Sequence, residues 1–414
     1  MAERIVVGLD IGTTKVCVLV GEVREGGQTR ILGVGIAPSR GVQGGMVADI
    51  GMASEAVSAA KRQAELSSGY EIGRAFVCVG GKHISSVNQQ GAVGLNSRAP
   101  VAREDMERAL DNACAIELPH QRDVLHVIPR FFTVDQRRDI PNPLGQYGYR
   151  LEVDAHIISV DTSALISLED CVRRAGLEVD RFIVNPLASA EAALSEAERA
   201  SGVLLVDIGA GTTGVALFDR NAVLHTAVMP IGGNHITNDI AQILHLPPDE
   251  AEHVKIEYGV SLPEMVGPDE VFNAQRFGEE SFTSMLRHEL AQIIEARVDE
   301  IFTFVKREIK RSGYDGLLTA GVVLTGGSAA LVGIQHNASR VMNLPARVAA
   351  PEKLSGLADK LRGPAYSAVV GLLRFSYQDQ PSRAPGSGSR RERRTRGPDI
   401  GKAITDFFGR LLPD

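Results

Sequence analysis

The sequence predicts an α/β protein with two similar halves and an amphipathic helix near its C-terminal end. Its 414 residues exceed what one hydrophobic core organises, so two or more domains are expected. Runs of β-branched residues alternate with stretches of helical periodicity, which favours the α/β class. One strand–turn–strand pattern also occurs twice, as RIVVGLDIGTTKVCVLVGEV from residue 4 and as GVLLVDIGAGTTGVALFD from residue 202.

Each half is expected to open with this repeated hairpin. In the first half, helices are predicted at residues 51–66, 103–117 and 165–176, and strands at 74–81, 123–135, 153–161 and 179–186. In the second half, helices are predicted at 234–245, 248–258, 282–312 and 364–375, and residues 321–331 read as a strand, a Gly-Gly turn and a helix start. Aligning Asp10 with Asp207 also matches the flanks of the two hairpins, which argues against a chance recurrence.

Composition is that of an ordinary globular protein, with 44% hydrophobic and 23% charged residues. The four cysteines (Cys17, Cys78, Cys114 and Cys171) form no CxxC pair and are expected to be buried, reduced thiols. The histidines show no HxxxH or HExxH spacing, so we infer no metal cage. We also expect no signal peptide before Asp10 and no transmembrane helix, because no run of 18 apolar residues occurs.

Charge is unevenly distributed along the chain. Residues 379–414 hold eight Lys or Arg and five Asp or Glu, a net of +3, so the remainder carries −10 of the total of −7. The acidic charge of the body argues against nucleic-acid binding by the body. The basic tail is then the segment expected to bind anionic partners.

The repeated turns have the residue types of a nucleotide-phosphate site. Glycines allow a close approach of the backbone to an anion, threonines add hydroxyl donors and a lysine adds a point charge. An Asp at each strand end suits Mg²⁺ held through its waters. The candidates are Asp10, Gly12, Thr13, Thr14, Lys15, Asp207, Gly209, Gly211, Thr212 and Thr213, with Asp10 and Asp207 as the catalytic and metal candidates.

Two further segments would complete a nucleotide site. The turn in LTGGSAAL, with Gly326, Gly327 and Ser328, would let an adenosine pack flat against the backbone. Glu252 and Lys255 share a helix face at i, i+3 and could bond a ribose or a base edge. A surface ion pair remains the alternative for this Glu–Lys pair, and three unrelated turns remain the alternative for the glycine segments.

These turns, in this order, resemble those of the actin-like ATPase superfamily, on the segments GLDIGTTK, NPLASAEAAL, LLVDIGAGTTGVALF, VLTGGSAAL and GPAYSAVVGLL. More specific segments resemble the FtsA family of bacterial cell-division proteins. They are RGVQGGMVADI, HVIPRFFTVDQRRDIPNPLGQYGYRLEVDAHII, MPIGGNHITNDIA and AEHVKIEYG, and the match covers residues 4–377.

The resemblance implies an actin-like two-lobe ATPase fold with an inserted α+β subdomain. The first lobe would comprise 1–82, 161–200 and a return helix at 364–377; the insertion 83–160; the second lobe 201–363, with a smaller subdomain at about 245–313; a disordered basic linker 378–398; and a membrane-targeting helix 399–414. It also implies a nucleotide-binding role for Gly232, Gly233 and Asn234.

The functional expectations follow from the same resemblance. A member of this family would bind ATP and Mg²⁺ and polymerise into actin-like filaments on the cytoplasmic face of the inner membrane at midcell. It would bind the C-terminal tail of the tubulin-like FtsZ and recruit later divisome proteins through the inserted subdomain. Arg297, Lys306, Arg307 and Lys310, on the helix predicted at 282–312, are the FtsZ contacts implied by analogy, and a plain solvated face is the alternative.

One position departs from the superfamily pattern. Where hydrolysing members carry Glu or Gln near the proline of the EPxAxA-like segment, this chain has Asn185. Asn is shorter and cannot act as a general base, so it would be a weak positioner of water and hydrolysis would be slow.

Three related functions are weighed against this one. A sugar or carboxylate kinase would need a catalytic Asp for the substrate hydroxyl, and no distinctive candidate is present. A pilus-assembly ATPase leaves the basic linker and terminal helix unexplained. A chaperone would need a peptide-binding domain after Tyr377, where only about 37 residues follow.

The last residues predict a helix that lies on a membrane. Five apolar residues recur at helical spacing, and about fifteen residues at ~1.5 Å each give roughly 22 Å, too short to cross a bilayer of ~30 Å. The predicted membrane contacts are Ile400, Ile404, Phe407, Phe408, Leu411 and Leu412. Five arginines in 390–396 would add attraction to anionic lipid. Docking on a partner's groove is the alternative.

Overall fold

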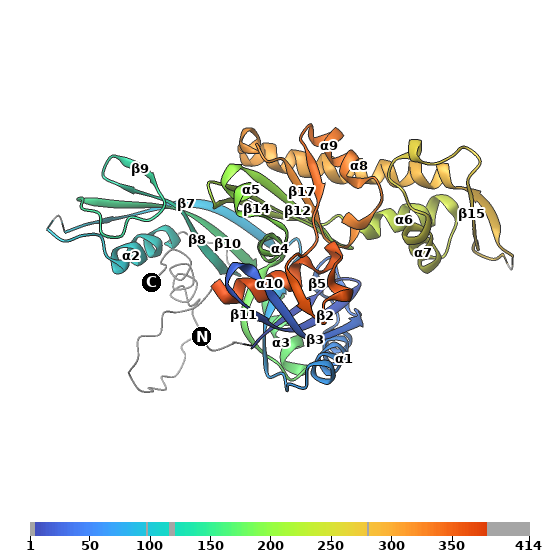
Figure 1. The fold of residues 1–414 in the computed structure, drawn as a ribbon, viewed down its shortest axis with the longest axis horizontal. Coiled ribbons are helices and arrows are strands. Elements are labelled where there is room, and N and C mark those ends of the chain that lie inside the picture. Colours follow the sequence, from blue (N-terminus) through green and yellow to red (C-terminus); the bar gives the residue numbers. More distant parts are fainter. Residues whose placement is uncertain (1–4, 97, 116–120, 280, 379–414) are drawn as a thin grey trace.

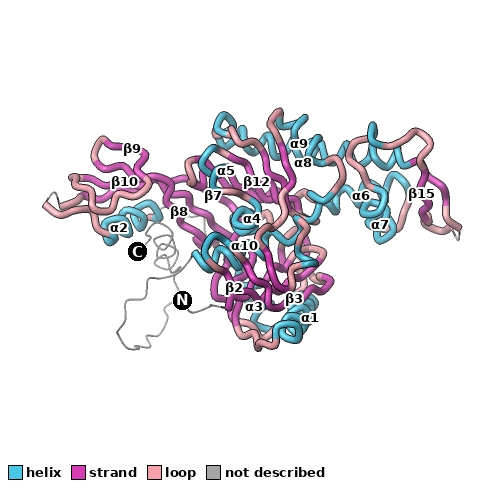
Figure 2. Tube along the Cα trace, in the orientation of Figure 1, coloured by secondary structure: helices cyan, strands magenta, loops and turns pink. Residues whose placement is uncertain are grey.

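The computed structural model describes residues 5–96, 98–115, 121–279 and 281–378; the predicted linker beyond Gln378 and the predicted membrane helix lie outside them. Two large sheets lie at the centre of an elongated molecule, a third sheet extends to one end, and helices α6 and α7 with strand β15 form the other end (Figures 1 and 2). Within the described ranges, no helix is both long and apolar enough to cross a membrane.

The first lobe is built on a six-stranded sheet in the order β11-β6-β1-β2-β3-β19. Its strands are β1 (Ile5–Ile11), β2 (Lys15–Val23), β3 (Thr29–Pro38), β6 (Arg74–Val79), β11 (Glu178–Val184) and β19 (Leu354–Gly356). Its helices are α1 (Ile50–Ser68), α3 (Thr162–Arg174), α4 (Asn185–Ala193) and α10 (Ser367–Gln378), and β4 (Val42–Gln43) pairs with β5 (Met46–Val47).

Alternation along the strands gives this sheet two apolar faces. In β2, Val16 and Val18 join the core that includes α1 and α3, while Cys17 and Leu19 join the core that includes α4 and α10. All four cysteines are buried and free, which confirms the expectation of reduced thiols. Helices therefore cover both faces of the sheet, because both faces are apolar.

The second lobe repeats this arrangement on a five-stranded sheet in the order β14-β13-β12-β17-β18. The strands are β12 (Val203–Ile208), β13 (Thr213–Asp219), β14 (Ala222–Met229), β17 (Val322–Thr325) and β18 (Ala346–Val348). The helices are α5 (Glu196–Ser201), α6 (Gly233–Leu244), α7 (Pro248–Tyr258), α8 (Arg287–Ser312) and α9 (Ile334–Met342), and a separate pair is formed by β15 (Val271–Ala274) and β16 (Thr283–Leu286).

Residues 84–161 form a third, antiparallel sheet in the order β7-β10-β8-β9, with one helix on it. Its elements are β7 (Ile84–Gly94), α2 (Arg103–Cys114), β8 (Arg122–Val134), β9 (Arg137–Ile140) and β10 (Arg150–Asp161). Helix α2 covers one face through a core of its own that contains Met106, Leu110 and Phe132. The opposite face meets β14 of the second lobe through polar contacts.

One predicted helix begins later than expected, and several strands, β3 and β7 among them, were not predicted. The helix predicted at 282–312 begins only at Arg287, because Thr283–Leu286 pairs with Val271–Ala274 as a strand. Strand β3 carries Gly35, which interrupts its apolar pattern because a Cβ there would lie 1.8 Å from the carbonyl oxygen of Ala60 on α1. Strand β7 is rich in Ser, Asn and Gln, and two of these residues, Ser86 and Asn88, bond across to the second lobe.

A buried histidine lies where the third sheet meets the second lobe. His156 Nδ1 is 2.6 Å from Asn88 Oδ1, and His156 Nε2 is 2.9 Å from Thr226 Oγ1. Asn88 donates through its Nδ2 to the carbonyl oxygen of Leu224, so Asn88 Oδ1 is an acceptor. The imidazole therefore carries its proton on Nδ1 and accepts the Thr226 hydroxyl at Nε2, which satisfies both nitrogens only while it is neutral.

We predict that His156 makes stability fall in mild acid. Burial, and then the nearby His225, Arg130 and His126, lowers its pKa from 6.5 to about 3. As pH falls below about 6.5 the unfolded chain takes up a proton that the folded state refuses, so stability present above pH 6.5 is lost toward pH 3, by about 2 kcal/mol at pH 5. Thermal unfolding of His156→Gln should drop less between pH 7 and pH 5 than wild type; equal drops would contradict this role.

Candidate functional site

The two repeated hairpins place an aspartate at the same point of each lobe. Asp10 pairs with Cys17 across β1–β2, and Asp207 pairs with Gly214 across β12–β13. Each turn then closes with a backbone hydrogen bond, from Gly12 N to Lys15 O at 3.0 Å and from Gly209 N to Thr212 O at 2.9 Å. The correspondence predicted from the repeated sequence is thus present in three dimensions.

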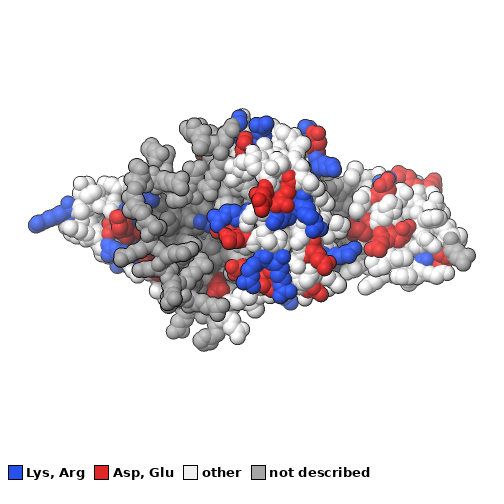
Figure 3. Space-filling view, turned by 90° about the horizontal axis from the view of Figure 1, so that it is seen from below, with Lys and Arg blue, Asp and Glu red and all other residues white. Residues whose placement is uncertain are grey.

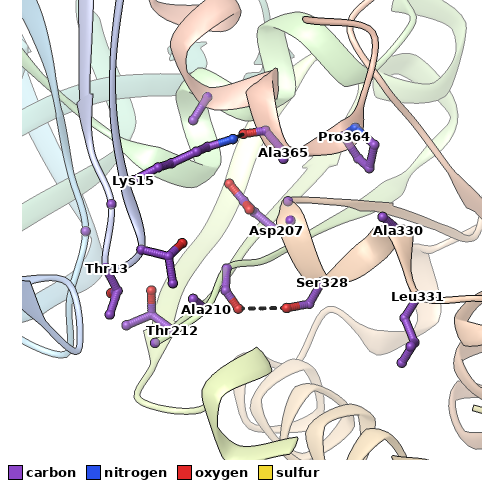
Figure 4. Close-up of a pocket in the computed structure, with 18 of the residues that line it drawn as sticks. Thr13, Lys15, Asp207, Ala210, Thr212, Ser328, Ala330, Leu331, Pro364 and Ala365 are labelled. Atoms are coloured by element: carbon purple, nitrogen blue, oxygen red, sulfur yellow. Dashed lines mark hydrogen bonds between the residues drawn. The ribbon is translucent and has the colours of Figure 1, made fainter. Parts of the chain in front are cut away.

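Both hairpins line one cavity of about 510 Å³ between the lobes (Figure 4). Most of the nucleotide-site candidates are brought together in its wall: Asp10, Gly12, Thr13, Thr14, Lys15, Asn185, Asp207, Gly209, Gly211, Thr212, Glu252, Lys255, Gly326, Gly327 and Ser328. They come from β1, β2, α4, β12, α7 and the turn after β17, so the wall is built from both lobes.

Four candidates lie outside the lining of the cavity. Thr213 is fully buried and donates through its hydroxyl to the carbonyl oxygen of Ile231 at 2.7 Å. Gly233 N and Asn234 N donate to the carbonyl oxygens of Gly209 and Ala210, at 2.9 and 2.7 Å. Gly232 precedes them at the start of α6. The start of α6 therefore fixes the turn of the second hairpin through two backbone hydrogen bonds, outside the cavity wall.

Burial dominates the electrostatics of the two aspartates. It raises the pKa of Asp10, against the opposing effect of the Lys15 charge. It also raises the pKa of Asp207 to about 6, with Ser189 Oγ donating to Asp207 Oδ2 at 2.5 Å in the opposite sense and Asp10 adding to the rise. Two carboxylates that disfavour each other's charge in a buried wall form a site that a cation would stabilise.

Lys15 and Asn185 bring further polar groups to the same end. Lys15 Nζ donates to the carbonyl oxygen of Ala365 at 2.8 Å and lies 3.5 Å from the centre of the Tyr366 ring. Burial lowers the pKa of Lys15, while the charge of Asp10 works against this. Asp10 Oδ1 and Asn185 Oδ1 are buried without a hydrogen-bond partner among the described residues, so two acceptors remain for an ion, a water or a ligand.

The other end of the cavity is apolar and contains residues that sequence reasoning missed. Ile236, Ile256, Ala330, Leu331 and Val332 line it, together with Gly259. The wall also includes Pro364 and Ala365, just before α10, Ala368 within that helix, and Ile11, Gly45, Gly80 and Ala210. Single aliphatic residues carry no motif of their own, but Ala330 and Leu331 lie within LTGGSAAL and Ile256 and Gly259 within AEHVKIEYG, which was the signal available.

Glu252 and Lys255 form an ion pair in the same cavity wall. Lys255 Nζ is 2.6 Å from Glu252 Oε2, and the lysine side chain is the more buried of the two. Ser328 Oγ donates to the carbonyl oxygen of Gly209 at 3.1 Å, which ties the turn after β17 to the second hairpin. Both residues of the pair line the cavity.

The four basic residues on α8 lie away from the cavity. Arg297 bonds Asp239 and Glu300, and Lys306 Nζ donates to the carbonyl oxygen of Val341. Arg307 is exposed with its guanidinium 5.8 Å from the centre of the Phe304 ring, and Lys310 is exposed one turn further on. Only Arg307 and Lys310 therefore present their charge freely on this helix.

Taken together, the cavity offers one polar and one apolar end. Backbone N–H groups, hydroxyls, a lysine and two carboxylates can hold an anion together with a divalent cation. The glycine turn and the aliphatic side chains at the other end can take a flat ring. A carboxylate–ammonium pair in the same wall can bond hydroxyl groups.

Comparison with known sequences places this arrangement in a family. The family model described as "Cell division protein FtsA" matches residues 204–371, and that described as "SHS2 domain inserted in FTSA" matches 81–159. The cell division protein FtsA of Pseudomonas aeruginosa is 42% identical over 377 residues, covering 91% of this chain and 90% of that protein. Those of Escherichia coli K12 and Bacillus subtilis are 38% and 36% identical, covering 91% and 90% of this chain and 91% and 83% of theirs.

Solved structures show the same fold at low sequence identity. The PilM-PilN type IV pilus biogenesis complex aligns with a TM-score of 0.65 and 17% identity, covering 90% of this chain and 98% of the other. MreB5 of Spiroplasma citri, solved bound to ADP, aligns with a TM-score of 0.55 and 13% identity, covering 91% and 97%. These neighbours confirm the actin-like two-lobe fold.

We predict that Gly326 cannot be replaced without loss of stability, whereas Gly327 can. Gly326 has φ +88°, and a Cβ there would lie 2.4 Å from Asp207 Oδ1. At Gly327 a Cβ would meet only the Ala365 Cβ, at 3.8 Å. Gly326→Ala should cost about 1–3 kcal/mol of unfolding free energy and Gly327→Ala much less, measured by denaturant unfolding. Equal effects would show that this turn does not constrain Asp207.

Proposed function

This chain belongs to the FtsA family of cell division proteins, and from that premise we propose that it is an ATP-binding, actin-like protein that holds division components at the membrane. The observation that supports ATP binding most directly is the cavity itself. Two equivalent hairpins, one from each lobe, present Asp10 and Asp207 to the same space. Lys15 adds a cation at that end, and the other end is apolar.

The residues present fit a magnesium nucleotide. The phosphates would lie between the hairpins, where Gly12, Thr13 and Gly209 line the wall. The unpartnered Asp10 Oδ1 and the raised pKa of Asp207 mark the carboxylates that would hold Mg²⁺ through its waters. When bound, the ion would neutralise phosphate charge and favour the charged form of both aspartates.

Asn185 is the residue from which we infer the rate of ATP hydrolysis. It is the first residue of α4 and lines the cavity, and its Oδ1 has no partner among the described residues. An amide oxygen can accept a hydrogen bond from a water but takes up no proton, so it orients the water without activating it. We therefore propose that ATP serves mainly to set conformation and assembly, with slow hydrolysis.

Nucleotide titration tests this part of the proposal. Wild type should bind Mg²⁺–ATP with release of phosphate far slower than binding. Lys15→Ala should bind ATP about 10- to 100-fold more weakly, because a hydrogen bond to a charged group is lost. The exposed Lys360 lies outside the cavity wall, so Lys360→Ala is the matched control and should bind like wild type. Absence of ATP binding by wild type, or phosphate release as rapid as that of a fast ATPase, would contradict the proposal.

The membrane role rests on the sequence of residues 399–414. The stripe formed by Ile400, Ile404, Phe407, Phe408, Leu411 and Leu412 would enter the lipid interface of the inner membrane, and the arginines at 390–396 would add attraction to its anionic lipids. One such helix binds weakly, so polymerisation into an actin-like filament would strengthen attachment by avidity. Residues 83–160 would recruit later divisome proteins.

The proposed partner on the other side is the C-terminal tail of FtsZ. Arg307 and Lys310 remain its proposed contacts, since Arg297 and Lys306 are already bonded within the chain. Acidic side chains gather at the end of the molecule that carries α6 and α7, seen in Figure 3. The C-terminal part of α8, which carries Arg307 and Lys310, lies over the central part of the molecule, away from that acidic end (Figure 1). Its two cations would favour contact with negatively charged groups of the tail.

Co-sedimentation with anionic liposomes in the presence of ATP tests the membrane role. Wild type should pellet with the vesicles and bring FtsZ with it. The double variant Phe407→Glu, Phe408→Glu should stay in the supernatant while binding ATP normally, because two charges replace the apolar side chains of the stripe. Arg307→Glu with Lys310→Glu should pellet but retain less FtsZ.

Two outcomes would overturn this assignment. If the Phe407→Glu, Phe408→Glu variant still pelleted, these residues would not be the anchor. If it lost ATP binding as well, the tail would not be separable from the body. Electron microscopy of the pelleted fraction should then show filaments for wild type, and their absence would remove the polymerisation step.

A further inference from the structure

We propose that Thr237 is a positioning residue that fixes Glu252 as the acceptor for a ribose hydroxyl, an inference that rests on the nucleotide site proposed above. Thr237 lies on α6 and is 7% exposed, while Glu252 and Lys255 lie one helix further on, on α7. The threonine does not line the cavity, but the Glu and the Lys do. It can therefore act only through them.

The three side chains form a closed triangle of hydrogen bonds. Lys255 Nζ donates to Thr237 Oγ1 at 2.8 Å and to Glu252 Oε2 at 2.6 Å. The Thr237 hydroxyl in turn donates to the same Glu252 Oε2. Because a hydroxyl has one hydrogen and accepts through its lone pairs, Thr237 fills both roles at once.

This triangle leaves no spare proton on the lysine. The third contact of Lys255 Nζ is the carbonyl oxygen of Gly233 at 3.3 Å, so its three hydrogens have three acceptors inside the protein. Glu252 Oε2 receives two donors, and within the described part of the chain Oε1 of the same carboxylate receives none. The pair therefore offers the cavity an acceptor, although it contains a cation.

An acceptor of this kind selects hydroxyl donors. The Glu252 side chain is 37% exposed against 13% for Lys255, so the carboxylate is the part of the pair that a ligand can reach. A ribose hydroxyl can donate to Oε1, while a sugar lacking that hydroxyl leaves the carboxylate unpaired when the ligand covers it. A sugar bearing a phosphate at that position would be repelled. The geometry thus points to an unmodified ribonucleoside.

A purely structural role for Thr237 is the alternative. Its hydroxyl also lies 3.2 Å from the carbonyl oxygen of Gly233, four residues earlier on the same helix. Thr303 on α8 makes the same kind of bond to the carbonyl oxygen of Asp299, at 2.8 Å, and lies outside the cavity wall. Thr303→Val therefore removes an equivalent helix contact and leaves the Glu–Lys pair intact.

The experiment compares affinities for ATP and for its 2′-deoxy and 3′-deoxy analogues. Wild type should bind ATP more tightly than at least one analogue. Thr237→Val keeps the shape but removes both hydrogen bonds, so ATP affinity should fall about tenfold and the ratio of ATP to analogue affinity should fall toward one. Thr237→Ser should restore both values, and Thr303→Val should match wild type. Thr237→Ala serves if the valine variant does not fold.

The outcomes separate this inference from the nucleotide site itself. If wild type did not bind ATP, the proposed function itself would be contradicted. Normal ATP binding with an unchanged ratio in Thr237→Val and Thr237→Ala would overturn the role of Thr237 alone. A fall in affinity for all three nucleotides by the same factor, with the ratio preserved, would also overturn it, because it would mark a structural effect without selection of the hydroxyl.

Discussion

Asp10 and Asp207 are two buried carboxylates that face one cavity from two lobes. Burial is the main cause that raises the pKa of each, and the charge of Asp10 raises the pKa of Asp207 further. Burying these carboxylates is unfavourable in free energy. The two β-hairpins that carry them are paired within their own sheets, which keeps the carboxylates at these positions. Lys15 offsets part of this unfavourable free energy, and its pKa is lowered by the same burial. A cation bound between the lobes would offset more of it, because it would favour the charged form of both carboxylates.

The surroundings of the pair are arranged to keep it in place. Behind the second hairpin, Gly233 and Asn234 bond its carbonyl oxygens and so orient the turn. Beside it, Ser189 on α4 donates to Asp207, and Asn185 at the start of the same helix reaches the cavity. The turn after β17 passes so close to Asp207 that only glycine fits at position 326. Residues outside the cavity wall, such as Gly233, Asn234 and Ser189, therefore help to set the geometry of residues within it.

The sequence predicted the repeated hairpins, the glycine turns and most of the polar cavity wall, because each depends on short local patterns. It did not predict β3 or β7. The first contains Gly35, required by the approach of α1, and the second has a polar face that bonds the neighbouring lobe. The strand at 283–286 was read as helix because it adjoins α8 without a break. The apolar end of the cavity and Thr237 were missed for a different reason: their roles arise only from contacts between distant segments.

The polar end of the cavity is also where the last described helix begins. Lys15 Nζ bonds the carbonyl oxygen of Ala365 and lies over the ring of Tyr366, in the turn that starts α10. Thr325, the residue before Gly326, donates to Ser367 in the first turn of that helix at 2.6 Å. Any ligand that draws Lys15 toward the carboxylates must therefore compete with a contact to α10. Because α10 packs in the core of the first lobe, that competition couples the polar end of the cavity to the lobe that carries the C-terminal segment.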